Sequence, residues 1–343
     1  MRRLNALRDR LPLWITLLLA GAGLAAWMGA AFGDLPVWAA SALDWASRFA
    51  VVFLGIFIEA APFLLLGTLA SGAVEVLIDR ATLAALLPRS ALGGALAGGL
   101  AGLFFPVCEC GVVPFARRLM RKGVPAPAAI AVLLAAPVIN PIVIASTLAA
   151  FGPGPLLWGR LGATLVIAVT VGALFGMNPR ASEILRAAAL PESGHLALDE
   201  EAPQGGRRFG EQVRRILVIA ADEFFEMGRF LVLGALLAAL MQTVVRQADL
   251  LAVGQGPVLS VVVMVTLAVL LSVCSTVDAF IALAFVGTFT GGAILAFLVY
   301  GPMVDVKSTL MFLRVFRPRA VIYLVLLPLL LTLTMAVLYN YFG

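Results

Sequence analysis

Three cysteines supply the first candidate chemistry in this sequence, and two of them stand one residue apart. Cys108, Glu109 and Cys110 precede Gly111, and the third cysteine, Cys274, follows much later. Thiolates favour soft ions such as Cu(I), Zn(II) and trivalent arsenic or antimony. We therefore expect Cys108, Cys110 and Cys274 to bind a soft species as transported cargo, with no resident cofactor. The alternatives are that they act as small hydrophobic residues or form a redox disulfide, which one intervening residue would strain.

Carboxylates within or beside apolar segments are candidates for proton coupling. A carboxylate buried in a membrane is costly, so it marks a functional site by default. Pairing with a nearby cation is the alternative, and Asp305 stands only two residues from Lys307. For Glu59 and Glu226, solvation near a helix end is the alternative. The candidates are Glu59, Glu109, Glu226, Asp278 and Asp305.

A second specific pattern is the hexapeptide Ala136-Pro137-Val138-Ile139-Asn140-Pro141. Two prolines four residues apart open a helix and free its carbonyl groups, and the amide of Asn140 can both donate and accept hydrogen bonds. Gly301-Pro302-Met303-Val304-Asp305 repeats the break. Broken helices at matching places in two halves indicate a transport site, although neighbours could also stabilise a simple kink. We therefore expect helix breaks at Pro137, Pro141 and Pro302.

These landmarks belong to a repeat of about half the chain. The segment from Glu59 to Gly67 resembles the segment from Glu226 to Gly234, 167 positions later. Val107-Cys108-Glu109-Cys110 corresponds to Val273-Cys274-Ser275-Thr276 at an offset of 166, and the two proline breaks are 165 positions apart. Asn140, Ser275 and Thr276 thus join the expected substrate-binding residues, although hydroxyls in helices often bond only to the backbone.

The composition indicates a membrane protein. Of the 343 residues, 62% are hydrophobic and 13% are charged, whereas soluble domains carry about 25% charged residues. The net charge of +5 comes from basic residues beside apolar runs, so it indicates topology and no nucleic-acid partner. The single histidine, His195, lies in a polar loop, which excludes a buried histidine ligand or proton relay.

Charge bias predicts how the apolar segments are threaded. The arginine-rich N-terminus is expected in the cytoplasm, because basic loops stay inside. The glycine- and proline-rich stretch 91–116 and the stretch 256–286, at the equivalent place in the repeat, are then expected to form re-entrant or broken-helix hairpins. The two repeats run in opposite directions, with seven crossings, or up to nine if the hairpins span fully. Full spans are expected at 11–32, 48–78, 124–150, 155–177, 214–245, 290–313 and 319–342.

The predicted fold is thus an all-α polytopic membrane protein with an inverted repeat. Residues 1–47 form an N-terminal transmembrane helix and outer loop, and 48–177 form the first repeat. Residues 178–213 are a polar cytoplasmic linker, and 214–343 form the second, inverted repeat.

One stretch of sequence resembles a known family. Residues 105–114 read Phe-Pro-Val-Cys-Glu-Cys-Gly-Val-Val-Pro, and Gly123-Val124-Pro125 and the segment 135–141 follow. This pattern is similar to the predicted permeases that include the ArsP organoarsenical efflux permeases and the YraQ-type permeases, from about residue 48 to the end. The resemblance implies an inner-membrane permease. For the arsenic-linked members it implies extrusion of soft metalloids by membrane cysteines, here Cys108 and Cys110, and less directly Cys274.

The sequence therefore predicts a bacterial inner-membrane secondary transporter and not an enzyme. It is expected to export a soft metal, metalloid or organometalloid species, with Glu109 coupling transport to protons. The chain lacks the Walker-type loop of ATP-hydrolysing proteins. The protein is expected to lie in the lipid bilayer. A homodimer or a complex with a small membrane partner is also possible from the sequence. The rival functions are a membrane thiol oxidoreductase using Cys108 and Cys110, and a channel or scaffold subunit.

Overall fold

A computed structural model describes residues 37–77, 88, 90–105, 107–177, 184–186, 209–244 and 256–342. The expected helix at 11–32, His195 and most of the linker at 178–213 lie outside these ranges. The chain divides into two compact units, 1–52 and 53–343. All contacts discussed below lie within the second unit.

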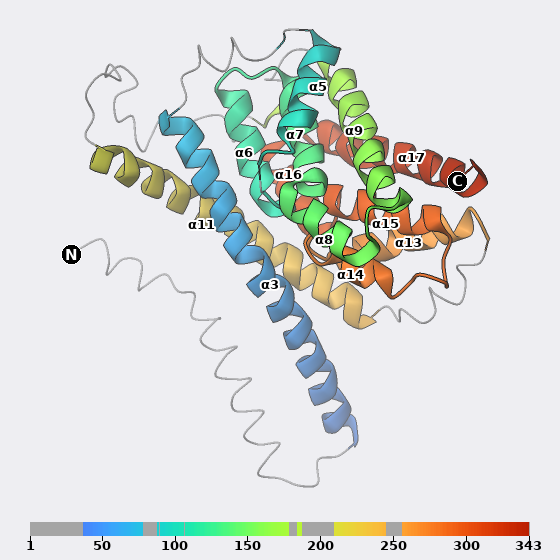
Figure 1. The fold of residues 1–343 in the computed structure, drawn as a ribbon. Coiled ribbons are helices and arrows are strands. Elements are labelled where there is room, and N and C mark those ends of the chain that lie inside the picture. The colour runs from blue at the N-terminus through green and yellow to red at the C-terminus, as the bar shows by residue number, and fades with distance from the viewer. Residues whose placement is uncertain are drawn as a thin grey trace. The chain divides into compact units, whose positions relative to one another are not determined.

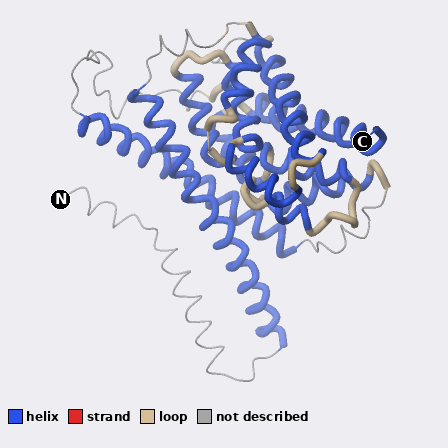
Figure 2. Tube along the Cα trace, in the orientation of Figure 1, coloured by secondary structure: helices blue, strands red, loops and turns tan. Residues whose placement is uncertain are grey.

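The described residues are almost entirely helical, as Figure 2 shows. Within them, six helical segments are long and apolar enough to cross a membrane: Ser41–Leu77, Ala126–Phe151, Pro155–Gly176, Gly210–Val244, Gly291–Val315 and Pro318–Phe342. These match six of the seven predicted spans. The all-α polytopic fold is therefore confirmed.

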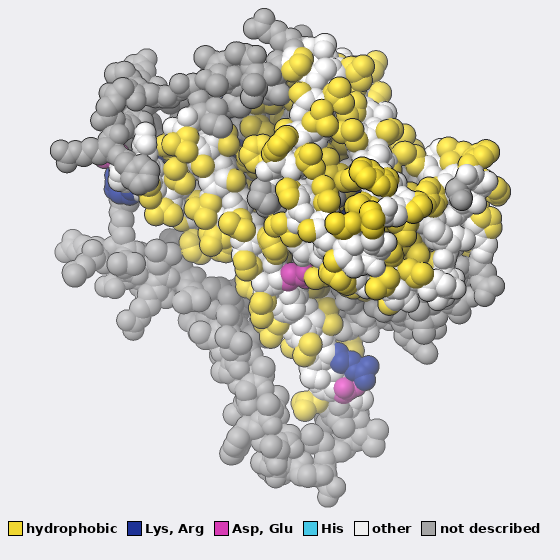
Figure 3. Space-filling model, in the orientation of Figure 1, with side chains coloured by type: hydrophobic (Ala, Val, Ile, Leu, Met, Phe, Trp, Pro, Cys, Tyr) yellow, Lys and Arg dark blue, Asp and Glu magenta, His cyan; other side chains and the backbone are white. Residues whose placement is uncertain are grey.

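Hydrophobic side chains cover the described surface seen in Figure 3, where charged groups are few. Across the described residues, exposed leucines and aromatics include Leu92, Leu96 and Trp158. Lipid is as apolar as these side chains, so a surface of this kind needs no polar cover in a bilayer.

Two of the six spanning segments are broken helices. Helix α7 (Ala126–Ile139) ends at Asn140, and α8 (Pro141–Phe151) begins immediately after it. Helix α15 (Gly291–Met303) is separated from α16 (Val306–Val315) by Val304 and Asp305. Pro137 and Pro302 lie inside α7 and α15 near their C-terminal ends, and Pro141 is the first residue of α8. The breaks therefore lie at the matching positions of the two halves.

The predicted hairpin stretches each consist of two short helices. Residues 91–116 contain α5 (Ala91–Ala101) and the start of α6 (Glu109–Arg121), and residues 256–286 contain α13 (Leu259–Leu271) and α14 (Asp278–Leu283). The longest of the four has 13 residues, which gives roughly 20 Å of helix. A helix of that length is shorter than the ~30 Å hydrocarbon core, so none of the four crosses the membrane alone.

The order of elements occurs twice along the described chain. Helix α3 (Val37–Leu77) precedes α5 to α8, and α9 (Pro155–Gly176) follows them. Helix α11 (Phe209–Val244) precedes α13 to α16, and α17 (Pro318–Phe342) follows them. Each half thus has a long helix, two short helices, a broken helix and a final long helix.

Packing follows the same pattern. Helices α5, α7 and α9 pack together, and α13, α15 and α17 do so in the second half (Figure 1). Between the halves, α6 packs against α16, and α14 packs against α8. The short helix after each hairpin turn therefore contacts the second part of the other half's broken helix.

Candidate functional site

The Cys-Glu-Cys motif lies at the beginning of α6. Cys108 is the residue before the helix, Glu109 is its first residue, and Cys110 follows. All three side chains are buried, and both cysteines are free thiols. The thiol of Cys110 interacts with that of Cys108. Because α6 packs on α16, this motif faces the break in the second half's helix.

A buried lysine joins the motif to that break. The Nζ atom of Lys307, in the first turn of α16, lies 3.5 Å from Glu109 Oε1 and 3.4 Å from Asp305 Oδ2. It also donates a hydrogen bond of 2.6 Å to the carbonyl oxygen of Ser272, just after α13. Lys307, Glu109 and Asp305 are each at most 2% exposed. We call Cys108, Glu109, Cys110, Cys274, Asp305 and Lys307 the central cluster.

Cys274 reaches the central cluster from the second hairpin. It is buried in the turn between α13 and α14, and its carbonyl oxygen accepts backbone hydrogen bonds from Val277 and Asp278. Its thiol interacts electrostatically with both Glu109 and Lys307. Carboxylates from both halves therefore contact one ammonium group, and the thiol of Cys274 interacts electrostatically with it.

Several buried oxygen atoms in this region have no hydrogen-bond partner. They are Glu109 Oε2, Asp305 Oδ2 and the hydroxyl oxygen of Ser275. Within the described residues, no three His, Cys, Asp or Glu side chains are placed to hold a metal ion together. The cluster is thus rich in ligand atoms, but in this conformation Lys307 is the cation it contains.

Asn140 and Asp305 perform the same structural task in the two halves. The side chain of Asn140 accepts a 3.0 Å hydrogen bond from Val143 N and so caps α8. Asp305 accepts one of 2.6 Å from Ser308 N and caps α16. Capping groups of this kind satisfy the free amides at a helix start. Asn140 also donates to the carbonyl oxygen of Val107, 3.4 Å away, next to the cysteine motif.

Asp278 lies in a different interaction, a pairing with a cation that sequence reasoning had left open without identifying the partner. It forms a two-pronged ion pair with Arg160 of α9, with N–O distances of 3.1 and 2.5 Å. Arg160 also donates to Thr147 of α8 at 2.8 Å, and both charged side chains are at most 2% exposed. An arginine within an apolar span is itself a signal of such a partner.

Glu226 also lies apart from the central cluster, in a charged network beyond it along α6. It pairs with Arg117 of α6 at 2.9 Å and with Arg314 of α16 at 3.1 Å. Arg118 pairs with Glu223 of α11 and, at 3.4 Å, with Glu75 of α3. The network therefore ties α3, α6, α11 and α16 together.

The remaining predicted residues border the cluster less directly. Glu59 is half-buried on α3 and interacts electrostatically with Lys307. Ser275 is buried beside Cys274, whereas Thr276 is partly exposed and hydrogen-bonds to Cys274. Lys307 is the residue of the cluster that sequence reasoning considered only as a partner for Asp305. Its contact with Glu109 joins segments about 200 positions apart, which no local pattern reveals.

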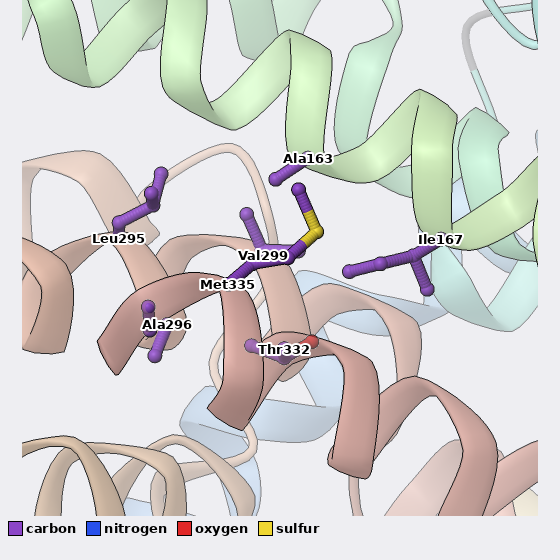
Figure 4. Close-up of a pocket in the computed structure, with 8 residues that line it drawn as sticks. Ala163, Ile167, Leu295, Ala296, Val299, Thr332 and Met335 are labelled. Atoms are coloured by element: carbon purple, nitrogen blue, oxygen red, sulfur yellow. The ribbon is translucent and has the colours of Figure 1, made fainter. Parts of the chain in front are cut away.

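An apolar hollow elsewhere offers no comparable chemistry. It lies between α9, α15 and α17, where Ala163, Ile167, Val299 and Met335 line it together with Thr332 (Figure 4). Its lining has one hydroxyl, from Thr332, and one thioether, from Met335, so the hollow provides no charged ligand for an ion.

Comparison with known proteins gives two curated relatives and one family. Protein YcgR of Bacillus subtilis is 41% identical over 275 residues, which cover 80% of this chain and 90% of the relative. A Streptococcus mutans protein named as a two-component membrane permease complex subunit is 37% identical over 275 residues, 80% of this chain and 89% of its own. No solved structure matches.

The family model matches residues 46–341 and is described as a predicted permease. These matches agree with the helical spans and point to a transporter and not to an enzyme. The family match covers both hairpins and both broken helices, and therefore the whole central cluster. The chain belongs to the predicted permease family, and it is a multi-pass membrane permease.

Proposed function

We propose that this permease is a secondary transporter that exports a soft metal, metalloid or organometalloid species through the central cluster. The observation that carries the proposal is the meeting of Cys108, Cys110 and Cys274 with Glu109 and Asp305 in one buried region. Thiols bind soft species, and buried carboxylates in a permease mark transport paths.

The repeated order of elements supports a two-repeat mechanism. Residues 48–177 contribute their hairpin to the cluster, residues 214–343 contribute both their hairpin and their broken helix, and 178–213 are the linker. In many transporters, two inverted repeats enclose a site at mid-membrane and alternate its exposure by moving against each other. We propose the same here, in a bacterial inner membrane with the N-terminus in the cytoplasm.

Coupling to protons is assigned to Glu109. Glu109 is next to both cysteines in the sequence and contacts Lys307, the only lysine in the described cluster. A change in the charge of this carboxylate would therefore alter the electrostatic environment of the other ligand groups. Glu59 and Asp305 are close enough to act on the same group. Asp278 and Glu226 are proposed to stabilise particular conformations, because each is paired with arginine.

A partner protein fits this proposal. The Streptococcus mutans relative is named as a subunit of a two-component membrane permease complex. We extend that name to this chain as a proposal: it works with a small membrane partner or as a homodimer.

Flux into and out of proteoliposomes tests the function. Zn²⁺, Cu(I) and methylarsenite would be screened with and without a pH gradient. Cells that lack the protein should accumulate the species that the liposomes transport. Unchanged cellular content together with no flux of any soft species would contradict the proposal, whereas changed thiol redox state at constant metal content would favour the oxidoreductase.

A further inference from the structure

The central cluster contains its own cation. The ammonium of Lys307 lies between carboxylates from the two halves, 3.5 Å from Glu109 Oε1 and 3.4 Å from Asp305 Oδ2. At 1% exposure, Lys307 cannot take its charge out to water in this conformation. Buried charges of one sign need a partner, because removing that partner leaves the remaining charge both desolvated and uncompensated.

The ammonium does not satisfy all the oxygen atoms around it. Its one hydrogen bond within the described residues goes to the carbonyl oxygen of Ser272 at 2.6 Å. Glu109 Oε2 and the Ser275 hydroxyl remain buried without hydrogen-bond partners, and Asp305 Oδ2 has only its ion pair with Lys307. Unsatisfied buried oxygens are rare in proteins and call for an explanation.

The backbone of Lys307 is held in place by the close approach of α11. A Cβ atom added to Gly234 of α11 would lie 2.8 Å from Lys307 Cα. The absence of a side chain at Gly234 thus lets α11 approach the first turn of α16. The base of the lysine is fixed, while its four-carbon side chain can still rotate about its own bonds.

We infer that Lys307 is a tethered counter-cation, which occupies the carboxylates while the carrier is empty and is displaced by a cationic substrate. The inference rests on the proposed function and narrows it: the cargo is a soft metal cation and not a neutral metalloid. A neutral species would not compensate the charges of Glu109 and Asp305, so Lys307 would have to stay beside them. A cation can replace the ammonium beside the carboxylates and can also be bound by the thiols.

The tethered ammonium of Lys307 explains how the carrier can change back to its starting conformation without cargo. After it releases its cargo, the site must pass through the occluded state again without two uncompensated carboxylates. Lys307 supplies the missing charge during that return. Exchange of one substrate ion for another needs no empty return, so exchange and net efflux depend differently on the lysine.

The test compares net Zn²⁺ efflux with Zn²⁺/Zn²⁺ exchange in proteoliposomes. In Lys307→Ala, we expect net efflux to fall at least about tenfold and exchange to stay within about twofold of wild type. Lys307→Arg, which keeps the charge, should retain more net efflux than Lys307→Ala. Arg319→Ala removes a cation from an exposed position and should leave both rates unchanged. Equal loss of both rates, or loss of neither, would overturn the inference.

A second variant serves if Lys307→Ala does not fold. Lys307→Gln combined with Asp305→Asn removes one charge of each sign. Asparagine can still cap α16, as Asn140 caps α8. We expect the ratio of exchange to net efflux to return toward the wild-type value. A ratio as abnormal as that of Lys307→Gln alone would contradict charge compensation.

Methylarsenite, which is neutral near pH 7, separates this inference from the proposed function. Transport of methylarsenite that requires Cys108 and Cys110 but is unaffected by Lys307→Ala would leave the function standing and overturn the counter-cation. If none of Zn²⁺, Cu(I) and methylarsenite moves, the proposed function fails and the inference fails with it.

Discussion

At the scale of residues, this permease is defined by buried charges that are paired across long stretches of sequence. Glu109 and Lys307 meet between α6 and α16, and Arg160 and Asp278 meet between α9 and α14. A buried ion pair is weak evidence for stability, but breaking one by removing a single partner is strongly destabilising. The two pairs differ in geometry: the Arg160 pair is two-pronged, whereas Lys307 is shared between two carboxylates.

The pair between Arg160 and Asp278 gives the first prediction. In Asp278→Asn, the arginine stays buried with only Thr147 as a side-chain partner, so we expect a loss of about 3–5 kcal/mol of stability. Thermal unfolding in detergent measures this loss. The double change Arg160→Met with Asp278→Asn should recover most of it, because no buried charge is left unpaired. A single change as stable as wild type would show that the pair is not structurally important.

The cap at the first helix break gives the second prediction. Asn140→Asp keeps an oxygen that can accept from Val143 N, whereas Asn140→Ala removes it. Loss of a capping group costs about 1 kcal/mol. Asn140→Ala should therefore unfold at lower temperature than Asn140→Asp in the same detergent. The reverse order would mean that the charge of the new carboxylate outweighs the cap.

At the scale of elements, close helix packing positions the cluster. A Cβ atom added at Gly67 of α3 would lie 2.2 Å from Gly111 Cα, and one at Gly234 of α11 would lie 2.8 Å from Lys307 Cα. These glycines end the two copies of the motif that begins with Glu59 and Glu226. In each half, then, a glycine of the long first helix allows that helix to approach a residue in or next to the cluster.

Alanine at these glycines gives the third prediction. Gly67→Ala and Gly234→Ala should each destabilise the protein by about 1–3 kcal/mol, because the added carbon overpacks the contact. Gly55→Ala and Gly228→Ala are matched controls on the same two helices, since a Cβ atom there meets nothing within 4 Å. The controls should be neutral or slightly stabilising, as alanine favours helix more than glycine does. Equal melting temperatures for all four variants would contradict the close approach.

The helices were predictable from the sequence to a greater extent than the ion pairs. Apolar runs gave six spans, with the starts of two of them off by four and seven residues and the other ends within two. The proline pattern gave both helix breaks, because each signal is local. The partners of Asp278 and Glu226 could not be found in this way. Arg160 lies 118 positions from Asp278, and Arg117 lies 109 positions from Glu226. Arg160 and Asp278 come together because α8 packs against both α9 and α14. Arg117 and Glu226 come together because α6 packs against α11.

At the scale of the whole molecule, the two halves repeat the same order of helices but provide different ligand groups. The first half provides Cys-Glu-Cys at positions 108–110, and the second provides Cys-Ser-Thr at 274–276. The first helix break is capped by a neutral residue, Asn140, and the second by Asp305. Sulfur therefore comes mostly from the first half, and the cation Lys307 comes from the second.

The direction of the two halves gives the fourth prediction. If the repeat is inverted, Arg121 at the end of α6 and Arg319 at the start of α17 lie on the cytoplasmic side, and Pro153 between α8 and α9 lies outside. We would place single cysteines at these positions and label them with an impermeant thiol reagent in intact and opened cells. The three native cysteines are buried and give a low background. Labelling of Arg121→Cys from outside would mean that residues 91–116 cross the membrane fully.

The most direct test of the central claim is the flux of soft species by the variant Cys108→Ser with Cys110→Ser. In proteoliposomes, we expect this variant to transport the wild-type cargo at least about tenfold more slowly, equivalent to about 1.4 kcal/mol. Its melting temperature should stay close to that of wild type, because serine fits the space of cysteine. Wild-type flux in the double variant would contradict the account, because the thiols could not then be ligands of the transported species.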